Sequence, residues 1–260
     1  MHRETITSAG VELDVFEDGA GSPILFLHSA QGFAPEHPYV VPLSARHRLI
    51  APSHPGFGKS GMADWIDAVD DIAYIYLELL DRLKLDQVDV IGCSIGGWIA
   101  AEIATKSPRS IRRLVLVGPV GVKTGPVDRL DVPDIFALPQ SELEKLLYHD
   151  PERMRMDPSR LSDEQLAISV RNRETLALLT WEPYMHNPKL RHRLHRITAP
   201  TLFLRGESDG LVSAEYLAAY ARLLPNARTD TIAAAGHAPH VEQPEAFARK
   251  VLAFLEVGAV

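Results

Sequence analysis

Short apolar runs alternate along the chain with segments whose apolar residues recur at helical spacing. Residues 11–17 alternate apolar and polar positions like a half-buried strand, and a turn at residues 18–21 leads to a second run. Most later runs are apolar on both faces, as in strands of a parallel sheet that helices cover. The runs predict strands at residues 11–17, 23–27, 47–51, 88–92, 114–118, 201–205 and 229–232. The helical spacing predicts helices at residues 70–83, 96–106, 213–223 and 244–255. This order predicts an α/β fold built in layers.

One interval departs from this rhythm. About eighty residues separate the runs at 114–118 and 201–205, where roughly 10 to 15 residues are enough for a helical connection. Helical patterns separated by prolines occur within it at residues 141–148, 162–179 and 188–194. We therefore predict one large domain with an insertion. Its core is expected to comprise residues 1–120 and 200–260, and a helical cap residues 121–199.

Composition narrows the class of protein. Of 260 residues, 46% are hydrophobic and 23% are charged, as in an average soluble globular protein. The formal charge of -7 gives no overall positive field, so we expect neither nucleic acid nor a membrane as partner. No apolar run approaches the roughly 20 residues that cross a bilayer. The single cysteine cannot form an intrachain disulfide, and the first residues lack the apolar stretch of a signal peptide, which together predict a cytoplasmic location.

The first chemical motif is Gly92-Cys93-Ser94-Ile95-Gly96, which stands between a strand pattern and a helix pattern. A serine on such a tight turn needs glycines two positions to either side, because a Cβ there would collide with the backbone or the neighbouring strand. The helix that starts there points the Ile95 amide at the charge on an attacked carbonyl oxygen. This predicts Ser94 as a nucleophile and Ile95 as an oxyanion donor. The alternative is that Ser94 only caps the helix.

With this motif the chain resembles the α/β-hydrolase superfamily over nearly its whole length. Members of that family run nucleophile, acid and histidine along the chain. Asp209, at the end of a strand run and a glycine turn, matches the acid position, with Glu207 as a competitor. His237, in a Gly-His pair, matches the histidine position, with His240 as its rival. The resemblance therefore implies a mostly parallel eight-stranded sheet flanked by helices, an inserted cap, and a Ser94, Asp209 and His237 triad.

The resemblance also implies the second oxyanion donor. After the run at 23–27, the family usually shows His-Gly followed by the residue whose amide completes the oxyanion hole, which gives this role to Ala30. Ser29 stands where glycine is expected, so either the loop takes another path or the hydroxyl contacts the substrate. The expected walls of an apolar pocket, each of which could instead be packing residues, are Phe33, Trp98, Trp181 and Met185.

Other chemistries fit the sequence less well. Cys93 is expected to be a small buried residue, since the family places the reactive atom on the central residue of the turn. Ser94 itself disfavours dehalogenase and epoxide hydrolase activities, because those relatives carry aspartate there. His192 and His195 are three residues apart, but they lack a third ligand at a recognisable spacing, and arginines beside them oppose a cation. We therefore predict no metal site.

The predicted function is hydrolysis of an ester-like bond in a small, largely apolar molecule through an acyl-enzyme on Ser94, with no cofactor. A carboxylesterase is favoured because it needs nothing beyond the triad. The alternative enzyme is a carbon–carbon bond hydrolase of aromatic ring-cleavage products. A further alternative, from a different functional class, is a sensor protein that uses this fold to bind a small molecule. An apolar edge of the cap could cover the pocket or form a contact in a homodimer.

Overall fold

The computed structural model describes residues 1–155 and 157–256. Eight strands form one sheet in the spatial order β1-β2-β4-β3-β5-β6-β7-β8. Their bounds are β1 (His2–Ser8), β2 (Val11–Asp18), β3 (Pro23–Leu27), β4 (Arg48–Pro52), β5 (Val88–Cys93), β6 (Ile111–Val117), β7 (Thr201–Gly206) and β8 (Ala227–Ile232). β2 runs antiparallel to both of its neighbours, and the other adjacent pairs are parallel. The predicted mostly parallel eight-stranded sheet is thus confirmed.

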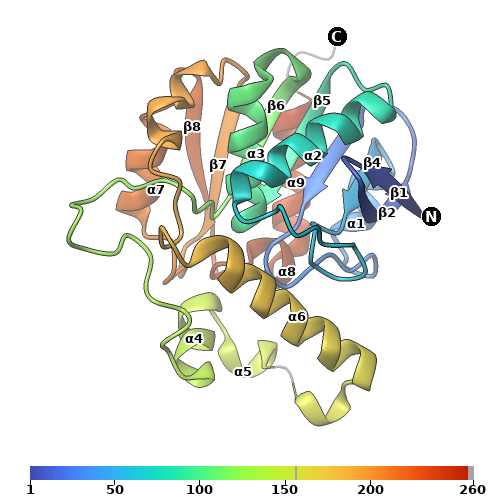
Figure 1. Ribbon diagram of the computed structural model, residues 1–260. Coiled ribbons are helices and arrows are strands. Elements are labelled where there is room, and N and C mark those ends of the chain that lie inside the picture. Colours follow the sequence, from blue (N-terminus) through green and yellow to red (C-terminus); the bar gives the residue numbers. More distant parts are fainter. Residues whose placement is uncertain (156, 257–260) are drawn as a thin grey trace.

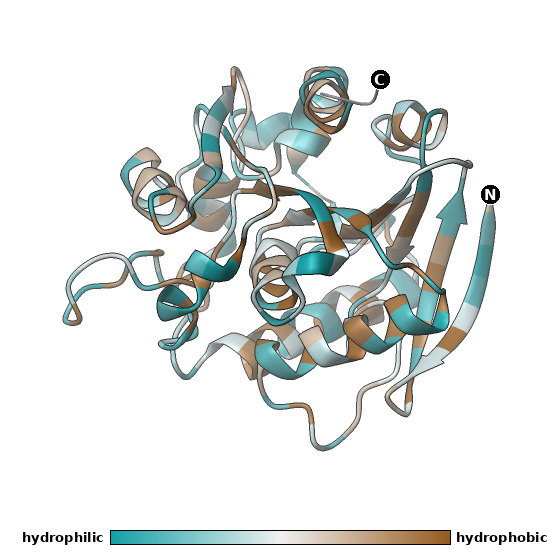
Figure 2. Ribbon diagram, turned by 90° about the horizontal axis from the view of Figure 1, so that it is seen from above, coloured by the Kyte–Doolittle hydropathy of each residue, from teal (hydrophilic) through white to brown (hydrophobic). Residues whose placement is uncertain are grey.

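Helices cover both faces of this sheet (Figure 1). One face carries α2 (Val69–Arg82), α3 (Ile95–Lys106) and α7 (Ala214–Ala221), and the other carries α1 (Val40–Ser44) and α9 (Pro244–Leu255). The buried apolar residues form one cluster on each face, so the central strands are covered on both sides. Figure 2 shows mostly brown strands at the centre of the sheet and helices banded in teal and brown around them. The apolar runs of the sequence are therefore the central layer of the fold.

The expected elements agree with the observed ones to within a few residues, and the exceptions are polar or very short. β1 escaped the sequence analysis because all but its last residue are exposed or half-buried, so it shows no apolar alternation. Its pairing with β2 from one end to the other holds it in the sheet. The short helices α1 and α8 (Pro239–Glu242) also lack a periodic pattern long enough to recognise.

The long interval between β6 and β7 contains α4 (Gln140–Leu147), α5 (Pro151–Met154) and α6 (Asp163–Thr180). The prediction of a helix at 188–194 was wrong, because the chain forms two short 3₁₀ helices in this region, Leu190–His192 and Leu194–Arg196. Figure 1 shows α4, α5 and α6 together at the end of the sheet where α8 also lies. The inserted helices thus lie at the carboxyl ends of the parallel strands, where open α/β sheets bind their ligands. Within the described ranges, no helix is both long and apolar enough to span a membrane.

Candidate active site

Ser94 occupies the turn between β5 and α3 in a strained conformation. Its φ of 55° and ψ of -115° are values that a residue with a Cβ rarely adopts. A Cβ on Gly92 would overlap the carbonyl of Gly96, and one on Gly96 would overlap the carbonyl oxygen of Leu27. The two glycines therefore allow the strand, the turn and the start of the helix to pack in backbone contact. Because Ser94 directly precedes α3, it lies at the positively charged end of the helix dipole.

Three loops bring Ser94, His237 and Asp209 together. The Nε2 atom of His237 lies 2.9 Å from the Ser94 hydroxyl oxygen, and its Nδ1 lies 3.0 Å from Oδ2 of Asp209. The other carboxylate oxygen, Oδ1, accepts the backbone N–H groups of Leu211 at 2.9 Å and Val212 at 2.8 Å. A carboxylate only accepts hydrogen bonds, so His237 donates from Nδ1 and leaves Nε2 free to accept the serine proton. This geometry fits general-base activation of Ser94.

The two competing residues have other surroundings. Glu207 is exposed, and its backbone N–H continues the sheet pairing by donating to Ile232 O at 2.8 Å. His240 is buried among the rings of Phe26, Tyr39 and Phe247. Burial lowers the pKa of His240 to about 3, so its ring is neutral at pH 7. The structure thus brings Asp209 and His237, rather than their competitors, to Ser94.

The expected oxyanion loop lies against the nucleophile turn, since a Cβ on Gly96 would also approach the carbonyl oxygen of His28. The loop accommodates Ser29 because its left-handed residue is Gly32, with a φ of 91°. Gly32 N–H donates to Ser29 O at 3.0 Å and closes the turn. The Ser29 hydroxyl accepts the Gln31 N–H at 3.4 Å, which gives it a partner within the loop. The roles of Ala30 and Ile95 as oxyanion donors stay predictions.

The inserted helices are bonded directly to the triad loops, a feature that the sequence did not reveal. At the end of α4, the carbonyl of Leu146 accepts the Gly210 N–H at 3.0 Å and that of Leu147 accepts the His237 N–H at 2.6 Å. Gln31 of the oxyanion loop donates its side-chain N–H to the Tyr148 hydroxyl. The last residues of α4 and the residue after it therefore contact the loop of Asp209 (the acid loop), the loop of His237 (the histidine loop) and the oxyanion loop.

A buried carboxylate also links the histidine loop to the residues that follow α4. Glu242, on α8, accepts the backbone N–H of Gly236 with one oxygen and those of His149, at 2.8 Å, and Asp150, at 3.3 Å, with the other. The imidazole of His149 also lies 2.8 Å from the hydroxyl of Ser208. Because these bonds flank Asp209 and His237, a movement of residues 146–150 would shift the triad.

The residues expected to line the pocket are dispersed. Trp98 is 3% exposed, donates its indole N–H to Glu102 at 3.3 Å and packs against Gly121. Phe33 packs against Phe16 and Phe26, with ring centroids 5.2 and 5.6 Å away. Trp181 is 57% exposed, with its ring 5.7 Å from that of Phe136. These contacts place Trp98 and Phe33 in packing and leave Trp181 largely on the surface.

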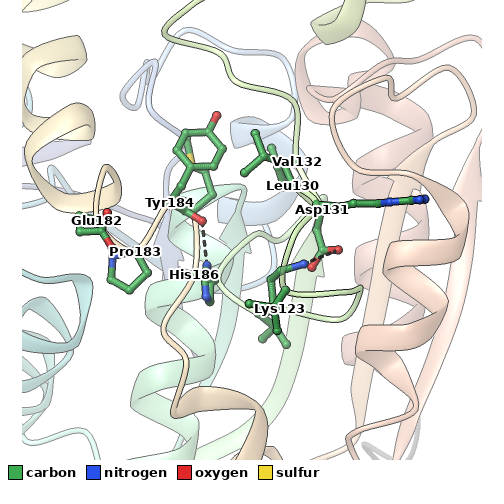
Figure 3. A pocket seen from close by; sticks show the side chains of 12 residues that line it. Lys123, Leu130, Asp131, Val132, Glu182, Pro183, Tyr184 and His186 are labelled. Carbon is green, nitrogen blue, oxygen red and sulfur yellow. Dashed lines mark hydrogen bonds and ion pairs between the residues drawn. The ribbon is translucent and has the colours of Figure 1, made fainter.

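Met185 lines a cavity of about 190 Å³ between residues 122–132 and 182–186. Figure 3 shows Lys123 and Asp131, which pair at 3.2 Å, on one side of it, and Glu182, Pro183, Tyr184 and His186 on the other. None of the three triad residues lines this cavity. Met185 is therefore a cavity residue, but not one that this structure places beside Ser94.

Cys93 is buried, as expected, and burial raises the pKa of its thiol above the ordinary range. A buried thiol that stays protonated is a packing group rather than a second nucleophile. In the described part of the chain, no group of three or more His, Cys, Asp and Glu side chains could hold a metal ion.

Comparison with known proteins agrees with the fold. The model of the alpha/beta hydrolase family matches residues 24–250. A 2-hydroxy-6-oxo-2,4-heptadienoate hydrolase from Pseudomonas putida is 28% identical over 280 aligned positions, which cover 96% of this chain and 95% of the relative. A 2-hydroxy-6-oxononadienedioate/2-hydroxy-6-oxononatrienedioate hydrolase from Cupriavidus pinatubonensis is 30% identical over 271 positions, 96% of this chain and 88% of the relative. The structure of the meta-cleavage product hydrolase CumD from Pseudomonas fluorescens IP01 superposes with a TM-score of 0.75 at 22% identity, covering 97% of both chains.

Proposed function

Since the chain belongs to the alpha/beta hydrolase family and is a hydrolase, we propose that it cleaves a carbon–carbon bond beside a ketone in a small conjugated keto acid. One observation carries this proposal. Relatives that align along almost the whole chain are named hydrolases of oxo-dienoates and of 2-hydroxymuconate semialdehyde. Sequence reasoning placed a carboxylesterase first and this activity second, and the relatives favour the second.

The triad geometry supplies the first half of such a reaction. The Ser94 hydroxyl attacks the ketone carbon while Nε2 of His237, 2.9 Å away, accepts its proton. Asp209 holds the imidazole by the 3.0 Å bond to Nδ1 and stabilises the imidazolium. The backbone amides of Ile95 and Ala30 are the proposed donors to the oxygen that becomes negatively charged.

The second half places a demand on the substrate. For the tetrahedral intermediate to expel carbon, the departing carbon must carry its electron pair into a conjugated carbonyl group. A dienoate with a hydroxyl on C2 meets this demand after it tautomerises to the keto form. The imidazolium of His237 then gives its proton to the departing fragment, and an acyl-enzyme stays on Ser94. Water, activated by the same imidazole, releases the acyl group as a carboxylic acid, so one water is consumed for each bond cleaved.

A carboxylesterase is the second candidate, and the oxyanion loop favours it. Carbon–carbon bond hydrolases of this fold are expected to carry a glycine-rich loop at this position, whereas Ser29, Ala30 and Gln31 each carry a Cβ. An ester needs no conjugated leaving group, because an alkoxide departs from the same tetrahedral intermediate. The two activities therefore share the triad and differ in the leaving group.

The test compares the purified protein with its Ser94→Ala variant on both kinds of substrate. We expect kcat/KM for 2-hydroxy-6-oxo-2,4-heptadienoate to exceed that for p-nitrophenyl acetate, butyrate and octanoate by about 100-fold, the range that a few specific contacts provide. The opposite preference would establish the esterase instead. No turnover of either kind, with no fluorophosphonate adduct on Ser94 in the folded protein, would overturn the hydrolytic role of this site.

A further inference from the structure

Two histidines that the triad does not use are buried behind the oxyanion loop. His28 directly follows β3 and is 1% exposed, and His54 lies just after β4 and is fully buried. Their ring centroids are 3.8 Å apart. Burying two imidazoles is costly unless their nitrogens are hydrogen-bonded, so the partners of these rings indicate what the pair does.

The hydrogen bonds of the pair determine where each proton lies. His28 Nδ1 is 2.6 Å from Ser29 O, so it donates, and His28 Nε2 accepts the His54 backbone N–H at 2.9 Å. His54 Nε2 is 2.9 Å from His28 O, so it also donates, and its Nδ1 accepts from the Tyr76 hydroxyl at 2.6 Å. All four ring nitrogens are thus used with both rings neutral. Burial supports this state, because it lowers the pKa of His28 to about 4 and that of His54 well below its ordinary value.

These bonds fix the two peptide groups that precede Ala30. His54 holds the carbonyl of His28, and His28 together with Gly32 N–H holds the carbonyl of Ser29. In a trans peptide the C=O and N–H point in opposite directions. Anchoring the Ser29 carbonyl on the histidine side therefore directs the Ala30 N–H away from the histidines.

We propose that Tyr76 and His54 are positioning residues, which aim the Ala30 amide at the oxyanion through His28. This inference rests on the proposed hydrolysis at Ser94 and adds residues to that mechanism. The Tyr76 hydroxyl gives His54 a donor at Nδ1, which keeps the proton on Nε2, where it binds the His28 carbonyl. Without that donor, the tautomer that places the proton on Nδ1 becomes accessible, and it has no donor for the His28 carbonyl.

The first test is Tyr76→Phe, which removes one hydroxyl from a fully buried ring of α2. Loss of an entire oxyanion donor lowers kcat by about 10² to 10³, so a misdirected donor should lower it by about tenfold, with KM nearly unchanged. The affinity for a trifluoromethyl ketone, which forms a tetrahedral adduct on Ser94, should fall by the same factor. A variant that folds and keeps the wild-type kcat and inhibitor affinity would overturn the proposal.

The chain offers a matched control in Tyr220→Phe. Tyr220 is also fully buried, and its hydroxyl has no hydrogen-bond partner among the described residues. Its ring packs on Phe203 and Tyr216, away from the histidine pair. We expect this variant to retain the wild-type kcat and inhibitor affinity. An equal loss in both tyrosine variants would show that any change in the core lowers activity, and would contradict a specific role for Tyr76.

A second pair of variants tests His54 itself. In His54→Gln the side-chain amide can still donate to the His28 carbonyl, whereas in His54→Leu nothing can. Compared at equal folded fraction, the glutamine variant should keep about tenfold more of kcat than the leucine variant, since it retains the bond that orients the loop. Equal losses would overturn the proposal.

A measurement without substrate separates this inference from the proposed function. A long-range ¹H–¹⁵N spectrum at neutral pH should show His28 protonated at Nδ1 and His54 protonated at Nε2. The reverse tautomer at His54 would overturn the positioning network whatever the activity. Failure of the wild-type protein to turn over any substrate or to form an adduct on Ser94 would instead overturn the proposed function, and it is measured before any variant is made.

Discussion

Replacing Asp209 by asparagine is the sharpest test of the triad, because the structure determines which way the new amide must face. Oδ1 of Asp209 accepts two backbone N–H groups, from Leu211 and Val212. An NH₂ group at that position would face two donors, so the amide oxygen takes it. The NH₂ group then occupies the place of Oδ2, 3.0 Å from Nδ1 of His237.

The consequence is a change of tautomer. An amide NH₂ donates, so Nδ1 of His237 must accept and the imidazole proton moves to Nε2, facing the Ser94 hydroxyl at 2.9 Å. In that form Nε2 cannot take the serine proton. A comparable substitution in a Ser-His-Asp triad lowers kcat by about 10⁴, which corresponds to about 5 kcal/mol in the activation free energy. KM should change little, because the substitution alters no contact to the ground-state substrate.

The assay is steady-state turnover of the better substrate by wild type, Asp209→Asn and Glu207→Gln, with thermal unfolding to confirm that each folds. Glu207→Gln is the matched control, since its carboxylate is exposed and only two residues away. We expect it to retain nearly full activity. If Asp209→Asn kept more than about a tenth of the wild-type kcat, the tautomer argument would fail. A large loss in Glu207→Gln instead would move the acid to that residue.

Two further predictions concern buried titratable groups. In Glu242→Gln an NH₂ donor replaces one of the two carboxylate oxygens, so it faces either the Gly236 N–H or the N–H groups of residues 149 and 150. The variant should therefore lose about 1 to 3 kcal/mol of unfolding free energy and have a lower kcat. Exposed Glu245→Gln is its control, and equal effects in denaturant titration would refute the assignment. Burial lowers the pKa of His240 from its ordinary value of 6.5 to about 3, so the unfolded chain binds more protons and the unfolding free energy falls as pH drops below 6.5. His240→Phe should reduce the loss of unfolding free energy between pH 6.5 and about 4.5 by about 2 kcal/mol, and an unchanged loss in urea unfolding would contradict this.

The sequence was informative where one local pattern carries both structure and chemistry. The strand, the two glycines and the helix around Ser94 are contiguous, and the steric demands of the turn leave a readable spacing. Asp209 and His237 lie far from Ser94 in the chain, and they were found from the order of motifs in the family. Once the carboxyl ends of parallel strands meet at one edge, the distances between these residues follow from the fold.

What could not be predicted depends on backbone groups or on partners distant in sequence. The carbonyls of Leu146 and Leu147 bind the triad loops, yet any residue type supplies a carbonyl, so no side chain marks them. No local pattern marks His54, because its partners, Tyr76 and His28, come from other elements. Trp98 shows a different difficulty: a large aromatic residue near the nucleophile is compatible with a pocket wall or with packing, and the bond from its indole N–H to a buried carboxylate favours packing.

These contacts change how the inserted helices are best understood. A lid that merely covered a finished site would touch the core through side chains at its rim. Here the end of α4 accepts the N–H groups of Gly210 and His237, each on a loop that carries a triad residue. The carboxylate of Glu242 then joins the histidine loop to residues 149 and 150. Because the same segment holds Gln31 of the oxyanion loop through Tyr148, the position of the inserted helices and the alignment of the catalytic groups depend on one set of hydrogen bonds.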